Sequence, residues 1–277
     1  MQEKLFKIAR VGLHHFEEPC ISGESGSGTI FFSGCTLNCK FCQNYSISAL
    51  NEGILVDKET LKKCMLYLQD LGANNINLVT PALYVNLLKN VLYETQSTLK
   101  IPIVWNSSGF ESEKSLEGLE GLVDIFLPDY KYSDDNLAWE YSNAKGYSEI
   151  AFKAISKMRK MCPVDEFDDN GLMKKGVIVR HLVLPEHVDN SLGVLDKIAE
   201  IDKDMYVSVM SQYFPTEQVK DHPVLGKRIT EEEYDEVINH FFEVGLHNGF
   251  SQEPSSAIEE YVPDFDLEAL KAILINF

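Results

Sequence analysis

The chain has 277 residues, of which 44% are hydrophobic and 25% are charged, a composition typical of a globular protein. Its net charge of −18 argues against binding to nucleic acids or anionic membranes, because both need a positive surface. The N-terminal residues lack the apolar core of a secretory signal, and no apolar run is long enough to cross a membrane. Six cysteines without a disulfide-like spacing fit a reducing compartment, so we expect a cytoplasmic protein.

Short β-branched runs alternate with longer helical patterns along the chain. Six runs rich in Val, Ile, Phe or Tyr predict strands at residues 29–33, 75–80, 101–106, 123–127, 176–184 and 205–210. Amphipathic patterns predict helices at residues 57–71, 83–93, 112–119, 134–161, 190–201 and 230–244. This order predicts an α/β fold with a parallel sheet inside and helices outside. Periodicity alone leaves a partial barrel and an open doubly wound sheet equally allowed.

Polar side chains follow the predicted strands, at the edge where parallel sheets carry functional groups. They are Thr80, Asn106, Ser107, Asp129, Lys131, Arg180, His181 and Gln212. Arg180 stands within an apolar run, and a charge buried there needs an acidic partner or a ligand. The others have structural alternatives: residues 106–109 can form a helix-cap turn, and Asp129 with Lys131 can form a surface ion pair.

Three cysteines occupy eight positions in a CxxxCxxC pattern after the first predicted strand: Cys35, Cys39 and Cys42. The polar residues between them argue against incidental core thiols. A structural zinc site needs a fourth ligand, and Cys20, His14 or His15 is the nearby candidate. A [4Fe–4S] cluster on three thiolates would instead leave one iron open to a small molecule, or serve electron transfer or sensing.

The residues around these cysteines carry a resemblance to a known family. The pattern Cys35-xxx-Cys39-x-Phe41-Cys42, preceded by Gly34, resembles the radical S-adenosylmethionine (SAM) superfamily. This resemblance implies a [4Fe–4S] cluster on the three cysteines, with SAM chelating the open iron. It implies an oxidoreductase that reductively cleaves SAM to a 5′-deoxyadenosyl radical, which abstracts hydrogen from the substrate. A low-potential electron donor, such as flavodoxin or ferredoxin, would supply the electron.

The likeness extends over about residues 10–255 and is similar to the branch related to pyruvate formate-lyase activating enzyme. It rests on residues 17–48 and on the strand ends Leu78–Pro81, Trp105–Gly109, Leu127–Lys131 and Met210–Pro215. It implies a single domain that forms a partial (β/α)6 TIM-like barrel. The expected divisions are a lead-in segment 1–28, a barrel core 29–250 and a C-terminal extension 251–277. The substrate would be a protein glycine or a small molecule.

The same resemblance implies roles for five residues in binding the cofactors. Lys131 and Arg180 would bind the SAM carboxylate, and Asp129 would orient the ribose, Lys131 or a small cation. Phe41 would cover the cluster or the adenine, and Gln212 would lie near the ribose or adenine.

Two strand ends differ from those of glycyl-radical activating enzymes. Thr80, or a nearby backbone carbonyl, would accept from the SAM amine where those enzymes have a Gly-Gly-Glu run. Asn106 and Ser107 would supply the polar groups where those enzymes have Asp-Thr-Asn-Gly.

Some features stay open at this stage. Residues 17–19 can line the substrate opening or form a solvated lead-in, and Cys20 can pack in the core or reach the active site. Cys64 and Cys162 stand far apart in the sequence, so we expect no auxiliary iron–sulfur cluster.

Overall fold

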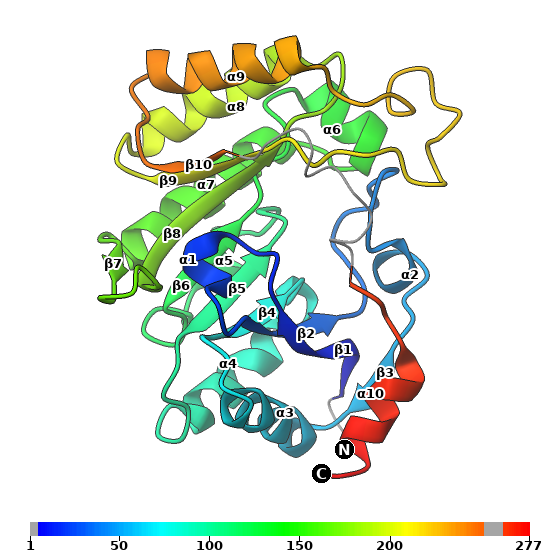
Figure 1. Cartoon of the computed structure of the whole chain (residues 1–277), viewed down its shortest axis with the longest axis vertical. Helices are drawn as coiled ribbons and strands as arrows, with labels where there is room; N and C mark the ends of the chain where they lie inside the picture. The colour runs from blue at the N-terminus through cyan, green and yellow to red at the C-terminus, as the bar shows by residue number, and fades with distance from the viewer. Residues whose placement is uncertain (1–4, 252–262) are drawn as a thin grey trace.

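The computed structural model describes residues 5–251 and 263–277, and its centre is one curved sheet (Figure 1). Six parallel strands lie side by side in chain order: β2 (Ser27–Phe32), β4 (Ile76–Val79), β5 (Ile103–Ser107), β6 (Ile125–Pro128), β8 (Met173–Leu182) and β9 (Tyr206–Met210). Each of them overlaps one of the six predicted strands. The sheet is open, with β10 (Gly249–Ser251) at one end and β3 (Ile54–Val56) at the other. The predicted partial barrel is therefore confirmed.

An antiparallel strand that the sequence did not predict extends the sheet beyond β2. This strand, β1 (Phe6–His14), pairs with β2 along most of its length, and β3 pairs with its first residues. Arg10 lies within β1, where its guanidinium donates to Thr29 Oγ1 (2.8 Å) and to the Leu13 carbonyl (2.9 Å). A short two-residue strand, β7 (Glu166–Phe167), pairs with the start of β8.

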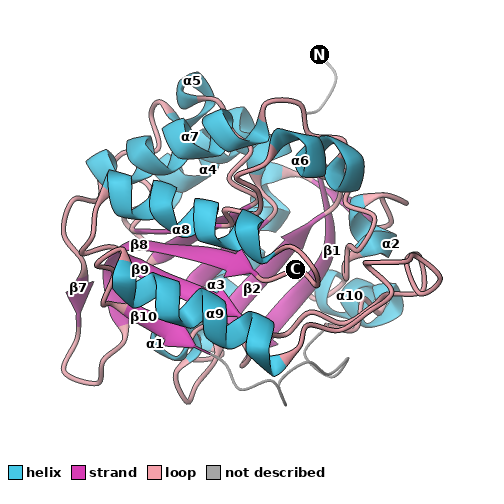
Figure 2. Ribbon diagram, turned by 90° about the horizontal axis from the view of Figure 1, so that it is seen from above, coloured by secondary structure: helices cyan, strands magenta, loops and turns pink. Residues whose placement is uncertain are grey.

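Helices cover the outer face of the strands (Figure 2). They are α3 (Lys58–Asp70), α4 (Val85–Thr95) after a 3₁₀ turn at Ala82–Tyr84, α5 (Glu113–Leu116), α6 (Asp135–Ser142), α7 (Tyr147–Met161), α8 (Val188–Ile201) and α9 (Glu231–Glu243). The remaining helices in the described part of the chain are α1 (Pro19–Ser22), α2 (Tyr45–Ser48) and α10 (Leu267–Leu274). None of the helices in these described ranges is both long and apolar enough to span a membrane.

One predicted helix, at residues 134–161, was wrong because the segment forms two helices. Asn143 adopts a left-handed conformation (φ 53°) that ends α6, and Gly146 (φ 69°) precedes α7. The other predicted helices begin within about two residues of the observed starts. Asp57 caps α3 by accepting from the Thr60 amide, and Thr230 with Glu233 forms the predicted capping box of α9.

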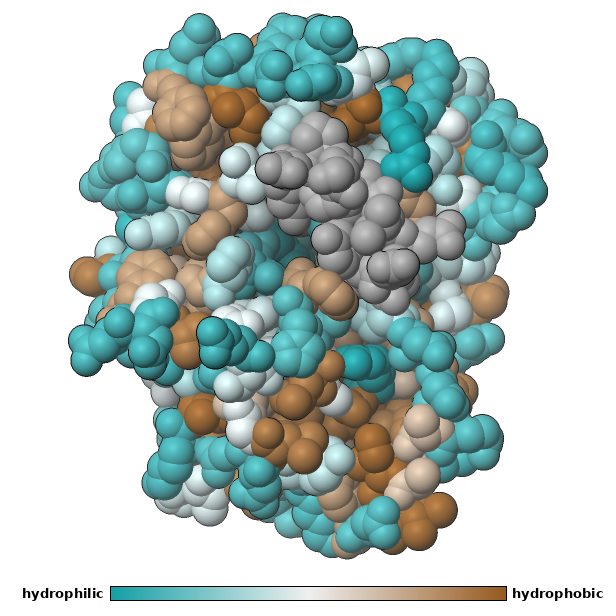
Figure 3. Space-filling model, viewed as in Figure 1, coloured by the Kyte–Doolittle hydropathy of each residue, from teal (hydrophilic) through white to brown (hydrophobic). Residues whose placement is uncertain are grey.

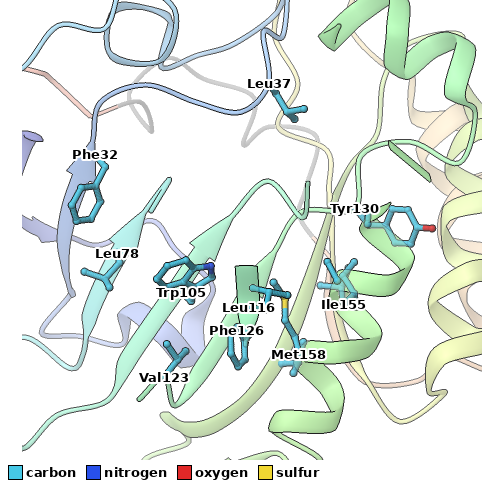
Figure 4. Close-up of a cluster of buried hydrophobic side chains, with 14 of the residues drawn as sticks. Phe32, Leu37, Leu78, Trp105, Leu116, Val123, Phe126, Tyr130, Ile155 and Met158 are labelled. Carbon is cyan, nitrogen blue, oxygen red and sulfur yellow. The ribbon is translucent and has the colours of Figure 1, made fainter. Parts of the chain in front are cut away.

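The two faces of the strands bury different kinds of side chain. Leu78, Trp105 and Phe126 belong to the core cluster between the sheet and the helices, and Met158 of α7 lies beside Phe126 (Figure 4). The outer face therefore forms the main hydrophobic core, which holds the sheet and helices together.

The inner face is apolar at one end of the strands and polar at the other. Cys20 and Ile21 of α1 pack on the inner side chains Val104, Ile125 and Ile178, so α1 fills the interior beside the strand starts. Further along β5 and β8, the inward positions are Asn106 and Arg180. Alternation along each strand thus sets a polar layer above an apolar floor.

The surface is mainly hydrophilic along the top of the view, over α9 (Figure 3). Hydrophobic side chains gather lower on the same face. The first turn of α9 carries the acidic residues Glu231, Glu232 and Glu233, consistent with the strongly negative net charge.

Candidate functional site

The three clustered cysteines lie on a loop, residues 35–44, that docks against the end of α6. Gly34, with φ 85°, turns the chain from β2 into this loop. The Asn38 amide donates to the Ser142 carbonyl (3.0 Å), and the Lys40 amide donates to the Tyr141 carbonyl (2.8 Å). These carbonyls stand in the last turn of α6, where intrahelical donors are missing. The unused acceptors of one helix end therefore fix the cysteine loop.

Each thiol has a polar neighbour. Ser142 Oγ donates to Cys39 Sγ (3.0 Å), the Leu37 amide lies 3.4 Å from Cys35 Sγ, and Ser48 Oγ lies 3.2 Å from Cys42 Sγ. Burial raises the pKa of Cys35, and it raises the pKa of Cys39 to about 12. Ligation through Cys35 and Cys39 would therefore require these two buried thiols to lose their protons.

The donor set fits a cluster better than a single ion. Within residues 5–251 and 263–277, no three His, Cys, Asp or Glu side chains converge as ligands of one metal ion. Cys20, the candidate fourth ligand for zinc, packs among apolar side chains of β5, β6 and β8 rather than beside the cysteine loop. An iron–sulfur cluster needs each thiolate at a different iron, which three thiols spread along one loop can provide.

Arg180 is the centre of a buried polar network. Its Nε donates to Asp129 Oδ1 (3.0 Å), one terminal nitrogen donates to Glu17 Oε2 (3.1 Å), and the other donates to Asn106 Oδ1 (2.6 Å). Asn106 and Asn77 in turn donate to the second oxygen of Glu17, at 3.2 and 3.1 Å. The buried charge in β8 thus has the acidic partners that its position requires.

Lys131 extends this network toward the cysteines. Its ammonium lies 2.7 Å from Asp129 Oδ2, and both side chains are at most 20% exposed, so this is not a surface ion pair. Burial alone would raise the pKa of Asp129, but Lys131 and Arg180 hold it below its ordinary value.

Gly109, with φ 70°, lets the loop after β5 approach the backbone of Asp129. A Cβ added at Gly109 would lie only 2.3 Å from the Asp129 carbonyl oxygen.

A cavity of about 230 Å³ brings most of the predicted site residues together. This space is the first cavity of the site. Among its lining residues are Cys39, Phe41, Cys42, Asn106, Asp129, Lys131, Arg180 and Gln212. The Phe41 ring stands edge-on to Tyr213, with ring centroids 5.8 Å apart. Thiols, cations and an aromatic face therefore share one space at the carboxyl ends of the strands.

Three predicted residues do not line the first cavity. Cys35 packs against the main hydrophobic core. The Ser107 hydroxyl donates to Glu111 Oε2. Thr80 has a left-handed backbone (φ 59°), and its amide donates to the Asn106 carbonyl (2.9 Å). Thr80 is therefore not part of the wall of the first cavity.

Glu17 is the main site residue absent from the predicted set. Its carboxylate lines the first cavity and is 9% exposed. The reading of residues 17–19 as lining an opening is the one that the structure favours over a solvated lead-in. Alternating hydrophobic residues in β1, ending just before Glu17, were the available signal.

Comparisons with known proteins agree with this geometry. The radical SAM superfamily description matches residues 29–192. An uncharacterized protein of Methanocaldococcus jannaschii, MJ0674, is 31% identical over 224 residues, which cover 76% of this chain and 61% of that protein. This chain therefore spans less than two thirds of that relative.

Two solved structures have a similar fold. The FeFe-hydrogenase maturase HydG of Carboxydothermus hydrogenoformans has a TM-score of 0.59 at 14% identity, covering 90% of this chain and 65% of that one. Streptococcus suis SuiB bound to S-adenosylmethionine has a TM-score of 0.58 at 13% identity, covering 79% of this chain and 48% of that one. At such identities the likeness concerns the fold alone.

Proposed function

The chain belongs to the radical SAM superfamily, and we propose that it binds a [4Fe–4S] cluster through Cys35, Cys39 and Cys42 and cleaves SAM reductively. When bound, the cluster and SAM supply a 5′-deoxyadenosyl radical that abstracts hydrogen from a protein glycine or a small molecule. The observation that carries this proposal is the first cavity, where two of the cysteines meet the charged strand ends. The SAM bound in the similar fold of SuiB also supports it.

The network around the first cavity suits the amino-acid part of SAM. Lys131 and Arg180 offer donors for a carboxylate, and Asp129 holds both cations in place. Glu17 and the backbone carbonyls of the strand ends offer acceptors for an ammonium group. We propose that Phe41 and Gln212 contact the adenosyl part, and that Thr80 acts through its backbone.

The protein's own work in this reaction is positioning and exclusion of water. The side chains of Phe41 and Tyr213 are buried and close one wall of the first cavity. We place the protein in the cytoplasm as an oxidoreductase, with flavodoxin or ferredoxin as the electron donor. The net charge of −18 fits a substrate other than nucleic acid.

Anaerobic reconstitution with iron and sulfide tests the proposal. The wild-type protein should gain about four irons and visible charge-transfer absorption, and with dithionite it should convert SAM to 5′-deoxyadenosine and methionine. Serine substitutions at Cys35, Cys39 or Cys42 should abolish both signals. Cys162→Ala is the matched control, because that thiol is buried away from the loop and should leave both signals intact.

Two outcomes would overturn the proposal. Stoichiometric zinc without visible absorption would indicate a structural metal site. A cluster without SAM cleavage would indicate an electron-transfer or sensing protein. A glycyl radical detected by electron paramagnetic resonance (EPR) with a candidate partner protein would select the glycine substrate over the small molecule.

A further inference from the structure

A second cavity, of about 310 Å³, adjoins the first on the side of α1. The two cavities share Phe16, Glu17, Arg180, Met210 and Gln212, so the Glu17–Arg180 ion pair forms part of the wall of each. The residues that line the second cavity but not the first are His15, Glu18, Pro19, Ser208, Phe250 and Ser251. It therefore lies within the barrel, next to the place proposed for SAM.

Glu18 is the charged group that belongs to this second cavity alone. The residue is 8% exposed, and Ser208 hydrogen-bonds to its carboxyl group. Its Oε2 atom has no hydrogen-bond partner, which among the described residues is true of only two other buried side-chain atoms. One of these is Oδ1 of Asn77, the residue that donates to Glu17. Both atoms are acceptors, so this part of the interior lacks donors.

The buried charges around the two cavities do not balance. Glu17, Glu18 and Asp129 are acidic, whereas Arg180 and Lys131 are basic. Glu17 and Asp129 each lie within ion-pair distance of a cation, but Glu18 takes part in none of the ion pairs of the described chain. The charge of Arg180 favours the ionised form of Glu18 without contacting it, but a buried carboxylate with no cation in contact is still costly, and a cationic ligand in contact would lower that cost.

We propose that the second cavity is the substrate subsite and that Glu18 binds a protonated amine of a small-molecule substrate. An ammonium group supplies three donors and the missing positive charge, and Phe16, Pro19 and Phe250 offer apolar surface to the attached carbon chain. Burial raises the pKa of Glu18, and a cation bound beside the carboxyl group would favour its charged form. Identifying the bound amine as a substrate rests on the proposed function, whereas the binding of an amine to Glu18 can be tested by itself.

The test compares three small probes of equal length: n-butylamine, n-butanol and butyrate. Binding to the reconstituted protein with SAM is followed by ligand-observed NMR at pH 7, where the amine is protonated. The amine should bind saturably, the alcohol about tenfold more weakly, and butyrate not at all. Glu18→Gln keeps the shape of the side chain but should weaken amine binding about tenfold, whereas Glu24→Gln, at an exposed position nearby, should not.

Two results would overturn the inference. Equal binding of the amine and the alcohol would show that charge is not recognised, and amine binding unaffected by Glu18→Gln would place the ligand elsewhere. SAM cleavage with dithionite is measured on the same wild-type sample. If cleavage fails while the amine still binds through Glu18, the proposed function is wrong and the subsite stands; the reverse outcome overturns the subsite alone.

Discussion

The hydroxyl of Ser142 donates a hydrogen bond to Sγ of Cys39, a residue 103 positions earlier in the chain. The same hydroxyl lies 2.7 Å from the Tyr132 hydroxyl, and both side chains are fully buried. The contact thus links the end of α6 directly to a proposed cluster ligand. Hydrogen bonds to ligand sulfur tune the reduction potential of iron–sulfur clusters.

Ser142→Ala should lower the reduction potential of the cluster, because the donor stabilises the more negative, reduced state. An EPR-monitored redox titration of the reconstituted protein measures this directly. Ser97→Ala, on the exposed surface, provides the control and should leave the potential unchanged. Identical potentials in Ser142→Ala and wild type would show that the contact does not act on the cluster.

Arg180→Ala should lower the free energy of unfolding by about 3 kcal/mol, because it leaves Glu17 and Asp129 buried without their shared cation. Arg180→Lys should recover only part of this loss, since an ammonium cannot reproduce three separately directed bonds. Urea denaturation checks both. Lys174→Ala removes an exposed ion pair with Asp168 and should cost less than about 1 kcal/mol. Equal losses at the two positions would contradict the structural role given to Arg180.

Glu111 should make stability depend on pH. It accepts from Trp105 Nε1 (2.9 Å) and from Ser107, yet burial raises its pKa above the ordinary glutamate value. A raised folded-state pKa means that the folded protein binds the proton more tightly, so its stabilising contribution is complete below the ordinary pKa and falls as pH rises through the raised one. The free energy of unfolding of Glu111→Gln, measured relative to wild type at the same pH, should therefore be higher at neutral pH than near pH 4.

Urea denaturation between pH 4 and pH 8 measures that difference. Because other buried carboxyl groups titrate in both proteins, only the difference between variant and wild type isolates Glu111. Glu117→Gln, at an exposed position, serves as the control for the loss of one carboxyl group. A difference for Glu111→Gln that does not change with pH would rule out the predicted proton uptake.

Two substitutions at Thr80 distinguish the effect of its backbone conformation from the effect of its hydroxyl group. A β-branched residue at φ 59° is strained, so Thr80→Gly should stabilise the fold by about 1 kcal/mol. Thr80→Ala removes the hydroxyl but keeps a Cβ in the same conformation, so it should bring no such gain. Neither change should weaken SAM binding, measured by calorimetry, because the side chain does not line the first cavity. Weaker binding by both variants would assign the contact to the hydroxyl instead.

The elements that the sequence predicted well are those whose signals are local. The six parallel strands are short apolar runs. Asp57 and Thr230 mark the starts of α3 and α9, because each caps its helix by accepting from an amide only three residues later. The helix predicted at 134–161 was wrong because apolar periodicity continues through the left-handed Asn143. The strand β1 was missed because its central Arg10 is satisfied by Thr29, which lies in another strand.

The site was only partly predictable for the same reason. The cysteine loop is a contiguous motif, and the polar residues at the strand ends follow from the parallel order. The Glu17–Arg180 contact joins residues 163 positions apart, so no local pattern could have predicted it. The unbalanced charge at Glu18 likewise arises only when α1 enters the barrel.

The docking of the cysteine loop on α6 sets an order of events during synthesis. The amides of Asn38 and Lys40 hydrogen-bond to the carbonyls of Ser142 and Tyr141, which are synthesised about a hundred residues later. Until α6 has formed and joined the sheet, the three thiols are tethered to a loop without its final shape. A cluster delivered to the nascent chain would meet an unshaped loop, so cofactor insertion should follow the folding of at least the first two thirds of the barrel.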